Sequence, residues 1–363
     1  MGAAIAGSAN NLYAWGWNAY GQLGLGNTTN RSSPVQVGAL TDWSEVGVGS
    51  LHSIAIRSDG SIWSWGFGLN GRLGLGNTTS YSSPKQIGSL TDWAKVLTGA
   101  ASYNGGAIKT NGTLWMWGNN GNGELGQGNQ IDRSSPVQVG ALTNWSLIRS
   151  GSGNIFSIKT DGTLWTWGRN DVGQLGHGDI TNRSSPVQVG ALTTWATGSC
   201  SEFSCFAIRT NGTLWSWGFN RYDSSGILGH GDTTDRSSPT QIGALTNWSK
   251  VSAGATHVVS VKTNGTLWAW GNNTYGQLGL GDTTARSSPV QIGSLTNWKD
   301  VACGAGFTIA VKTDNTLWAW GNGANGRLGL GNTTNYSSPK QIGSLTNWNK
   351  IASGYGHTLA TTQ

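Results

Sequence analysis

A unit of about fifty residues repeats along the whole chain, and this repeat constrains the fold more than any other feature. Each copy contains Ser-Ser-Pro, and successive prolines are 50, 52, 50, 53, 50 and 50 residues apart. The seven prolines of the chain all belong to this tripeptide: Pro34, Pro84, Pro136, Pro186, Pro239, Pro289 and Pro339. Periods of this length are typical of solenoids and propellers. Because the repeats fill residues 1–363 without a linker, we predict a single domain.

The pattern inside one repeat predicts strands and tight turns. The stretch SIAIRSDGSIWSWG alternates apolar residues on both sides of Asp59-Gly60, a pair that suits the positive φ angles of a tight hairpin turn. We predict three strands at residues 43–48, 53–57 and 61–66. A fourth lies near the Ser-Ser-Pro segment, where proline fits best at a strand start or a sheet edge.

Four-stranded units with this period predict radially arranged sheets. The sequence begins with the third strand of a repeat and ends after the second strand of a repeat. Residues 348–361 and 12–38 would therefore supply the first two and the last two strands of one shared blade. An open ring would leave unpaired strand edges, which promote aggregation. The sequence therefore predicts an all-β, seven-bladed β-propeller of four-stranded blades, closed by a blade shared between the N- and C-termini.

The repeat motifs resemble the regulator of chromosome condensation repeat family. These motifs are G-x-x-H, L-W-x-W-G, G-Q-L-G-x-G and S-S-P-x-x-V/I-G, and the resemblance covers all seven repeats. It implies a seven-bladed propeller with a shared closing blade. It implies no single function, because the family hosts unrelated activities.

Two activities of this family depend on features that the sequence lacks. Guanine-nucleotide exchange uses a wedge inserted in one blade, whereas repeats here exceed fifty residues by three at most. Plant UV-B photoreceptors use a G-W-R-H-T motif, and the matching stretches here read GSLHS, GATHV and GYGHT. Trp-rich bacterial β-lactamase-inhibitory propellers hold a protein with loops on one face, and this mode of binding remains open.

The tryptophans and histidines that could act in catalysis or metal binding are better explained as packing and hydrogen-bonding residues. Paired tryptophans such as Trp63 and Trp65 point to one face of a strand, so we predict that they pack one blade on the next. His52, His257 and His357 share one repeat position on three blades, and positions spread around a ring cannot converge on a metal ion except near the axis. No acidic pair recurs, and no nucleotide-binding glycine motif is present. We therefore predict no enzyme activity, no cofactor and no metal.

Differences among the repeats concentrate on one face of the predicted propeller. This face carries the turns after the first strands and the loops after the third strands. One repeat combines a divergent turn with a three-residue loop insertion, and exposed aromatic and arginine side chains are typical binding anchors. We predict partner contacts at Trp17, Phe67, Tyr103, Arg169, Phe203, Phe219, Arg221 and Tyr222.

Arginines and cysteines lead to two further predictions. A recurring arginine lies three residues before the proline and forms either a solvated rim charge or an anion-contact ring. Its members are Arg31, Arg133, Arg183, Arg236 and Arg286. Cys200 and Cys205 flank the divergent turn and predict a disulfide across the hairpin mouth.

Composition limits the classes of partner. Only 10% of the residues are charged, the net charge is +6, and no Lys or Arg run is present, so nucleic acid is not an expected partner. No apolar run reaches the roughly 18 residues that span a membrane, so we expect no membrane insertion. We predict a non-enzymatic protein-interaction or structural scaffold for a protein partner or assembly neighbours.

Two alternatives remain. The first is a regulator that binds a small GTPase or chromatin, and the second is a lectin-like glycan binder. Low charge and loops rich in Thr, Asn and Gly favour an extracellular or virion surface, for example a phage component, over the cytoplasm.

Overall fold

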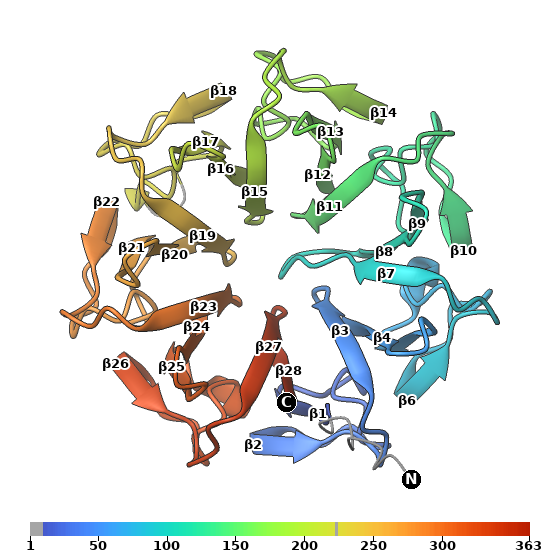
Figure 1. The fold of residues 1–363 in the computed structure, drawn as a ribbon, viewed down its shortest axis with the longest axis horizontal. Helices are drawn as coiled ribbons and strands as arrows, with labels where there is room; N and C mark the ends of the chain where they lie inside the picture. The colour runs from blue at the N-terminus through green and yellow to red at the C-terminus, as the bar shows by residue number, and fades with distance from the viewer. Residues whose placement is uncertain (1–9, 222–223) are drawn as a thin grey trace, which may run out of the picture.

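The computed structural model describes residues 10–221 and 224–363, which form seven four-stranded antiparallel sheets around one axis (Figure 1). The first strands are β1 (Leu12–Gly16), β2 (Arg31–Gln36), β3 (Trp43–Val48), β4 (His52–Arg57), β5 (Ile62–Gly66), β6 (Tyr81–Gln86), β7 (Trp93–Val96), β8 (Asn104–Lys109), β9 (Leu114–Gly118), β10 (Arg133–Gln138), β11 (Trp145–Ser150), β12 (Asn154–Lys159), β13 (Leu164–Gly168) and β14 (Arg183–Gln188). The later strands are β15 (Trp195–Cys200), β16 (Ser204–Arg209), β17 (Leu214–Gly218), β18 (Arg236–Gln241), β19 (Trp248–Ala253), β20 (His257–Lys262), β21 (Leu267–Gly271), β22 (Arg286–Gln291), β23 (Trp298–Cys303), β24 (Phe307–Lys312), β25 (Leu317–Gly321), β26 (Tyr336–Gln341), β27 (Trp348–Ser353) and β28 (His357–Thr362). Short 3₁₀ turns η1 (Leu69–Gly71) and η3 (Ala324–Gly326) follow β5 and β25. Within the described residues, no helix is long and apolar enough to cross a membrane.

The ring closes through a blade that both ends of the chain build. Its strand order is β2-β1-β28-β27, and β1 pairs antiparallel with β28, with Leu12 opposite Thr361. The other six sheets each use four consecutive strands. The predicted seven-bladed fold and its shared closing blade are therefore confirmed.

Asp-Gly hairpins fix the second and third strands of a blade. In the β4–β5 turn, Asp59 Oδ1 accepts hydrogen bonds from the Ser61 amide at 2.9 Å and the Ser61 hydroxyl at 2.6 Å. Gly60 has φ 79°, and a Cβ atom there would lie 2.0 Å from the Thr91 carbonyl oxygen. Glycine is needed here both for the backbone angle and for the close approach of the next crossing segment.

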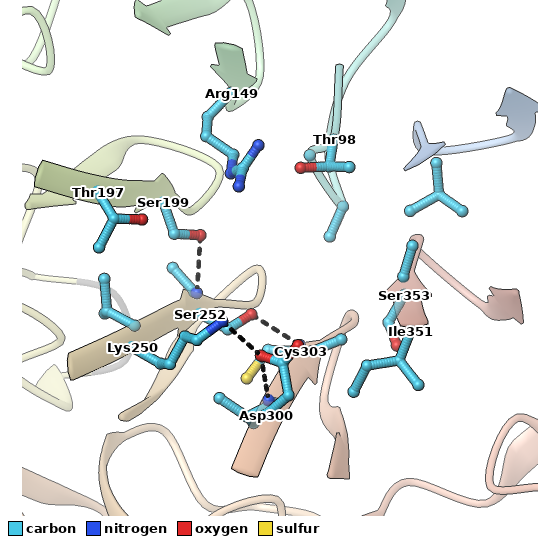
Figure 2. Close-up of a pocket in the computed structure, with 18 of the residues that line it drawn as sticks. Thr98, Arg149, Thr197, Ser199, Lys250, Ser252, Asp300, Cys303, Ile351 and Ser353 are labelled. Carbon is cyan, nitrogen blue, oxygen red and sulfur yellow. Dashed lines mark hydrogen bonds and ion pairs between the residues drawn. The ribbon is translucent and has the colours of Figure 1, made fainter. Parts of the chain in front are cut away.

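The first strand of every blade faces the axis. Side chains from these strands line a central cavity of about 400 Å³ (Figure 2). All seven first strands contribute to the lining, and the residue two positions after the opening tryptophan belongs to it in every blade. Glu45 and Lys350 are examples.

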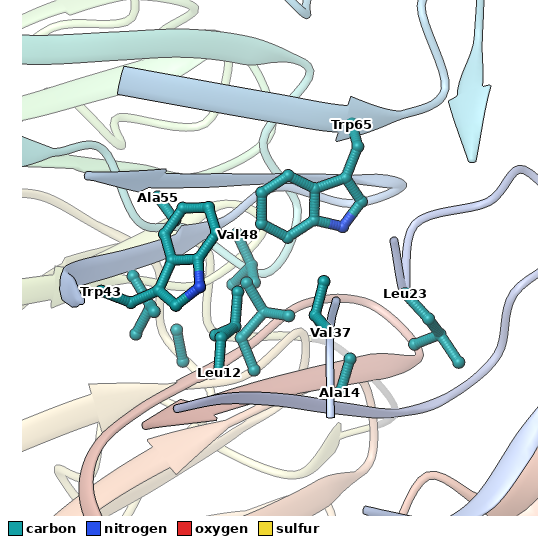
Figure 3. Packing of buried hydrophobic residues seen from close by; sticks show 11 residues of the cluster. Leu12, Ala14, Leu23, Val37, Trp43, Val48, Ala55 and Trp65 are labelled. Atoms are coloured by element: carbon teal, nitrogen blue, oxygen red, sulfur yellow. The ribbon is translucent and has the colours of Figure 1, made fainter. Parts of the chain in front are cut away.

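Tryptophans hold neighbouring blades together, as predicted (Figure 3). Trp65 is fully buried, and its Nε1 donates to the Gln22 carbonyl of the closing blade at 2.9 Å. Trp43 packs edge-to-face on Trp65 with ring centroids 6.2 Å apart, and both belong to one buried cluster with Leu12, Ala14 and Leu23 of the closing blade. The inter-blade indole bond recurs for Trp117, Trp167, Trp217, Trp270 and Trp320.

The first tryptophan of each pair has a different role from the second. Trp63 is only half-buried, and its Nε1 donates to Ser61 Oγ of its own hairpin at 2.9 Å. A basic side chain covers the equivalent ring in other blades: Lys159 Nζ lies 3.6 Å from the ring centroid of Trp165. Burial against this ring lowers the pKa of Lys159. The first tryptophan of a pair therefore lies at the edge of the core, where a basic side chain covers its ring in a cation–π contact.

Candidate functional site

Turns and loops that differ among the repeats meet on one face of the propeller, here called the variable face. It consists of the turns after the innermost strands (residues 49–51, 99–103, 151–153, 201–203, 254–256, 304–306 and 354–356) and the segments after each Trp-Gly pair. The amide of Trp17 donates to the Gly356 carbonyl at 2.8 Å, and the amide of Phe219 donates to the Phe203 carbonyl at 3.0 Å. Backbone hydrogen bonds thus join the two divergent segments of a blade.

One group of predicted contact residues lies across the blades β11–β14 and β15–β18, and we call it the Phe203 cluster (Arg169, Phe203, Phe219 and Arg221). The rings of Phe203 and Phe219 meet edge-to-face with centroids 6.3 Å apart. The Arg169 guanidinium lies 5.1 Å from the Phe203 ring, and that of Arg221 lies 5.7 Å from Phe219. The two aromatic rings are therefore flanked by cations from two blades.

Charge in the Phe203 cluster is balanced by acids of the same loops. Arg169 pairs with Asp171 at 2.6 Å, and Arg221 pairs with Asp235 at 2.7 Å. The Arg221 side chain is 67% exposed, the most accessible cation of the cluster. Exposed ion pairs of this kind contribute little to stability, so exchanging these carboxylates for others would cost little. Tyr222, the remaining predicted contact of this loop, lies outside the described residues.

A second group joins the closing blade to the next two blades, and we call it the Phe67 cluster (Trp17, Tyr20, Phe67, Arg72 and Tyr103). Tyr20 packs between Trp17 and Phe67, with centroid distances of 5.8 Å and 4.4 Å. The Arg72 guanidinium lies 5.0 Å from the Phe67 ring and 5.3 Å from the Tyr103 ring. The structure thus connects three predicted residues through two that were not predicted.

Arg72 occupies a position that is glutamine in three of the seven repeats, at Gln22, Gln174 and Gln277. It is only 4% exposed, its Nε donates to the Leu69 carbonyl at 2.9 Å, and burial lowers its pKa. Arg327 is the equivalent residue before the closing blade, and it donates to the Ala305 carbonyl at 3.1 Å. The replacement of Gln by Arg was visible in the sequence, but its place beneath the aromatic rings depends on the fold.

The arginines predicted as an anion-contact ring begin the outermost strands. Arg183, Arg236 and Arg286 each pair at 2.7 Å with an aspartate four residues earlier. The hydrogen bond from Arg236 lowers the pKa of Asp232 to about 2. Arg133 donates to Gln127 Oε1 at 3.2 Å, and Arg31 lies 3.5 Å from the Asn30 carbonyl. Three of the five charges are thus neutralised locally, which favours the rim-charge interpretation.

Cys200 and Cys205 stand opposite each other in the β15–β16 pair and are joined by a disulfide. The bond closes the hairpin that carries Phe203. Cys303 is buried in the free form, and burial raises the pKa of its thiol to about 12.

A thiol count checks the disulfide. We expect one reactive thiol per chain in denaturant without reductant, and three after reduction. Replacing both Cys200 and Cys205 with serine should lower the free energy of unfolding by about 2 kcal/mol, because the closed loop is short. Three thiols before reduction would contradict the bridge.

Histidines at the shared repeat position are buried in contacts between blades. His357 Nε2 lies 3.1 Å from Ser53 Oγ, and His257 Nε2 lies 2.9 Å from Thr308 Oγ1. Burial lowers the pKa of His52 and His257 to about 3. Nowhere in residues 10–221 and 224–363 do three His, Cys, Asp or Glu side chains gather as metal ligands would.

Comparison with known sequences gives family matches over most of the chain. Residues 148–360 match the RCC1-like domain, and residues 10–56, 59–102 and 111–158 match the regulator of chromosome condensation (RCC1) repeat. The ultraviolet-B receptor UVR8 of Arabidopsis thaliana is 43% identical over 51 residues, which are 14% of this chain. The match spans 12% of the length of that receptor.

Comparison with solved structures gives the same fold. Prp20p from Saccharomyces cerevisiae, described with its binding to Gsp1p and histones, has a TM-score of 0.85 at 21% identity, covering 98% of this chain and 92% of that one. Human WBSCR16 has a TM-score of 0.86 at 18% identity, covering 98% and 99%. At these identities the likeness concerns the fold alone.

Proposed function

This chain belongs to the regulator of chromosome condensation (RCC1) repeat family, and from that premise we propose that it is a non-enzymatic scaffold whose variable face holds a protein partner. The Phe203 cluster carries the proposal. It combines aromatic rings with flanking guanidinium groups, the residue types that dominate the binding energy of protein interfaces.

The location of the cluster also supports a protein partner. Phe203 lies in a turn that the Cys200–Cys205 disulfide closes, and Phe219 is tied to that turn by a backbone hydrogen bond. A rigid aromatic anchor loses little conformational entropy on binding. The arginines beside it favour a partner segment that brings carboxylates and an apolar side chain.

Residues that could support catalysis have structural roles instead. His257 and His357 make hydrogen bonds between blades, and the second tryptophan of each pair is enclosed in the core. The enclosed indoles also argue against a lectin that stacks sugars on the tryptophan rings, so we do not propose glycan binding.

A combined Phe203→Ala, Phe219→Ala and Arg221→Ala variant tests the proposed face. A photo-crosslinking residue at position 219 should first identify the partner in extracts of the native source. The triple variant should then bind the purified partner at least thirtyfold more weakly in surface plasmon resonance, about 2 kcal/mol, with its melting temperature nearly unchanged.

Leu192→Ala is the matched control. Leu192 is 41% exposed in the crossing between β14 and β15, at the opposite ends of the strands from the variable face. Its replacement should leave the affinity unchanged. Equal losses from both variants, or none from the triple variant, would refute the placement.

A GTPase or chromatin regulator is the alternative, because Prp20p has the same fold and is described with binding to Gsp1p and histones. Purified Gsp1p and histones are the probes for this alternative. Micromolar or tighter binding to either at about 0.15 M salt would favour it over an unrelated partner. Binding that disappears between low salt and 0.15 M would indicate nonspecific attraction to a basic chain.

An extracellular or virion-surface location remains our proposal from composition. The Cys200–Cys205 disulfide supports it, because disulfides persist mainly in oxidising compartments. Localisation of the tagged chain in its native source is the direct test.

A further inference from the structure

The axial cavity carries a set of charges that the variable face does not explain. Its charged side chains come from equivalent positions, two residues after the opening tryptophan of different first strands. They are Glu45, Lys95, Lys250, Asp300 and Lys350. Arg149 adds one further cation, two residues further along its strand. The cavity therefore contains four cationic and two acidic side chains.

Both acids have cationic neighbours in the cavity. Glu45 Oε1 lies 2.5 Å from Lys350 Nζ, and Asp300 Oδ1 lies 3.8 Å from Lys250 Nζ. Lys95 Nζ contacts the Ser146 carbonyl oxygen. The excess positive charge therefore belongs to Lys95 and Arg149.

Arg149 points into the cavity from β11 (Figure 2). Its Nη1 donates to the Ile148 carbonyl at 2.9 Å, and no carboxylate of the described residues lies within ion-pair distance of it. Burial lowers the pKa of Arg149, an effect that Glu45 and Asp300 oppose from a greater distance. An arginine stays charged in proteins, so this cation is held in the cavity without a paired anion.

Two hydroxyl groups lie at the same level as Arg149 on the next two blades. Ser199 Oγ accepts a hydrogen bond from the Ala253 amide at 3.0 Å, and Ser252 Oγ accepts one from the Cys303 amide at 2.9 Å. Both serines line the cavity. A hydroxyl that accepts such a bond still has its proton to donate, so both can donate to a ligand on the axis.

Small residues complete this level of the cavity. Ala302 and Ala352 occupy the position of Arg149 in two other blades, and they leave room across the axis. The Arg149 guanidinium and the two serine hydroxyls therefore line one space, whereas the lysines lie two residues earlier on their strands and contact other groups. The volume of about 400 Å³ is in the range of small-molecule sites, about 300–1,000 Å³.

We propose that the axial cavity binds a small phosphate-containing anion, with Arg149 as its main anchor and Ser199 and Ser252 as donors. The guanidinium fork matches phosphate oxygens in pairs, and the hydroxyls reach further oxygens of the same group. Free inorganic phosphate and the phosphoryl group of a small metabolite share this chemistry. The site is separate from the partner contacts on the variable face.

Calorimetric titration tests the site, with inorganic phosphate, pyrophosphate and glucose 6-phosphate as probes at constant ionic strength. We expect one site per chain, a raised melting temperature with the bound probe, and at least tenfold weaker binding for Arg149→Gln. Tighter binding of the two inorganic probes would indicate a free ion, whereas tighter binding of the sugar phosphate would indicate a metabolite.

Arg133→Gln on the rim is the control, because Arg133 also has one hydrogen bond and no ion pair in the described structure. It should keep the wild-type affinity. Arg149→Lys keeps the positive charge but lacks the paired N–H donors of the guanidinium group, so it should bind the probe with intermediate affinity. It replaces Arg149→Gln as the test variant if that chain does not fold. No binding by the wild-type chain, or equal losses from the rim and cavity variants, would overturn the proposal.

Discussion

Replacing Trp65 with alanine should lower the free energy of unfolding by about 3–5 kcal/mol, the range measured for large aromatic residues in protein cores. The Trp65 indole is fully buried between two blades, and its hydrogen bond to the Gln22 carbonyl would also be lost. The neighbouring chain cannot collapse into the space, because β3–β6 and the closing blade are each fixed by their own hydrogen-bond ladders. Urea titration followed by circular dichroism measures the change.

Trp63→Ala is the matched control, two residues away on the same strand. Trp63 is half-buried and bonds only within its own hairpin, so its removal should lower the free energy of unfolding by about 1–2 kcal/mol. If Trp63→Ala were as damaging as Trp65→Ala, the second tryptophan would not be the main connection between blades.

This difference between paired tryptophans shows how far the sequence determines the fold. The fifty-residue period, the Asp-Gly turns and the complementary termini were sufficient to predict seven blades and their closure. The period of two along a strand placed Trp63 and Trp65 on the same face. It could not distinguish their burial, because that depends on how far each blade overlaps the next.

The variable face was predictable for a similar reason, and only in part. Divergence among the repeats indicated Phe203 and Phe219 as candidates, and the antiparallel hairpins necessarily bring their segments together. Tyr20 and Arg72 were missed because their contacts cross between blades. The cavity around Arg149 was missed as well, because its lining joins single residues from strands about fifty positions apart.

The buried histidines make folding sensitive to acid. His52 and His257 have folded-state pKa values of about 3 and His357 of about 4, all below the ordinary 6.5, and burial is the largest cause for each. The folded state therefore favours neutral imidazoles, whereas the unfolded chain takes up protons once the pH falls below 6.5. The stability from these groups is complete above pH 6.5 and is lost as the pH falls toward 4 and then 3.

The loss of folding stability in acid should be large. Each histidine contributes about 1.4 kcal/mol per pH unit in this window, so three together give about 4 kcal/mol per unit. Between pH 6.5 and 4 the loss is about 10 kcal/mol, so a domain in the lower part of the ordinary stability range, about 5–10 kcal/mol, should unfold between about pH 5.5 and 4. The salt-bridged Asp232 has a pKa lowered to about 2 and titrates below this window, whereas burial raises the pKa of Glu124 and acts in the opposite direction.

Residues found in other repeats suggest a variant that tests whether the buried histidines cause the acid sensitivity. Asn104 and Asn154 occupy the histidine position in two other blades, so a combined His52→Asn, His257→Asn and His357→Asn chain keeps a side chain that this position accepts. Its free energy of unfolding should change much less between pH 6.5 and 4. A smaller dependence on pH should persist because burial also lowers the pKa values of His177 and His230. If the free energy of unfolding of this variant fell with pH as steeply as that of the wild-type chain, protonation of groups other than these three histidines would cause the acid sensitivity.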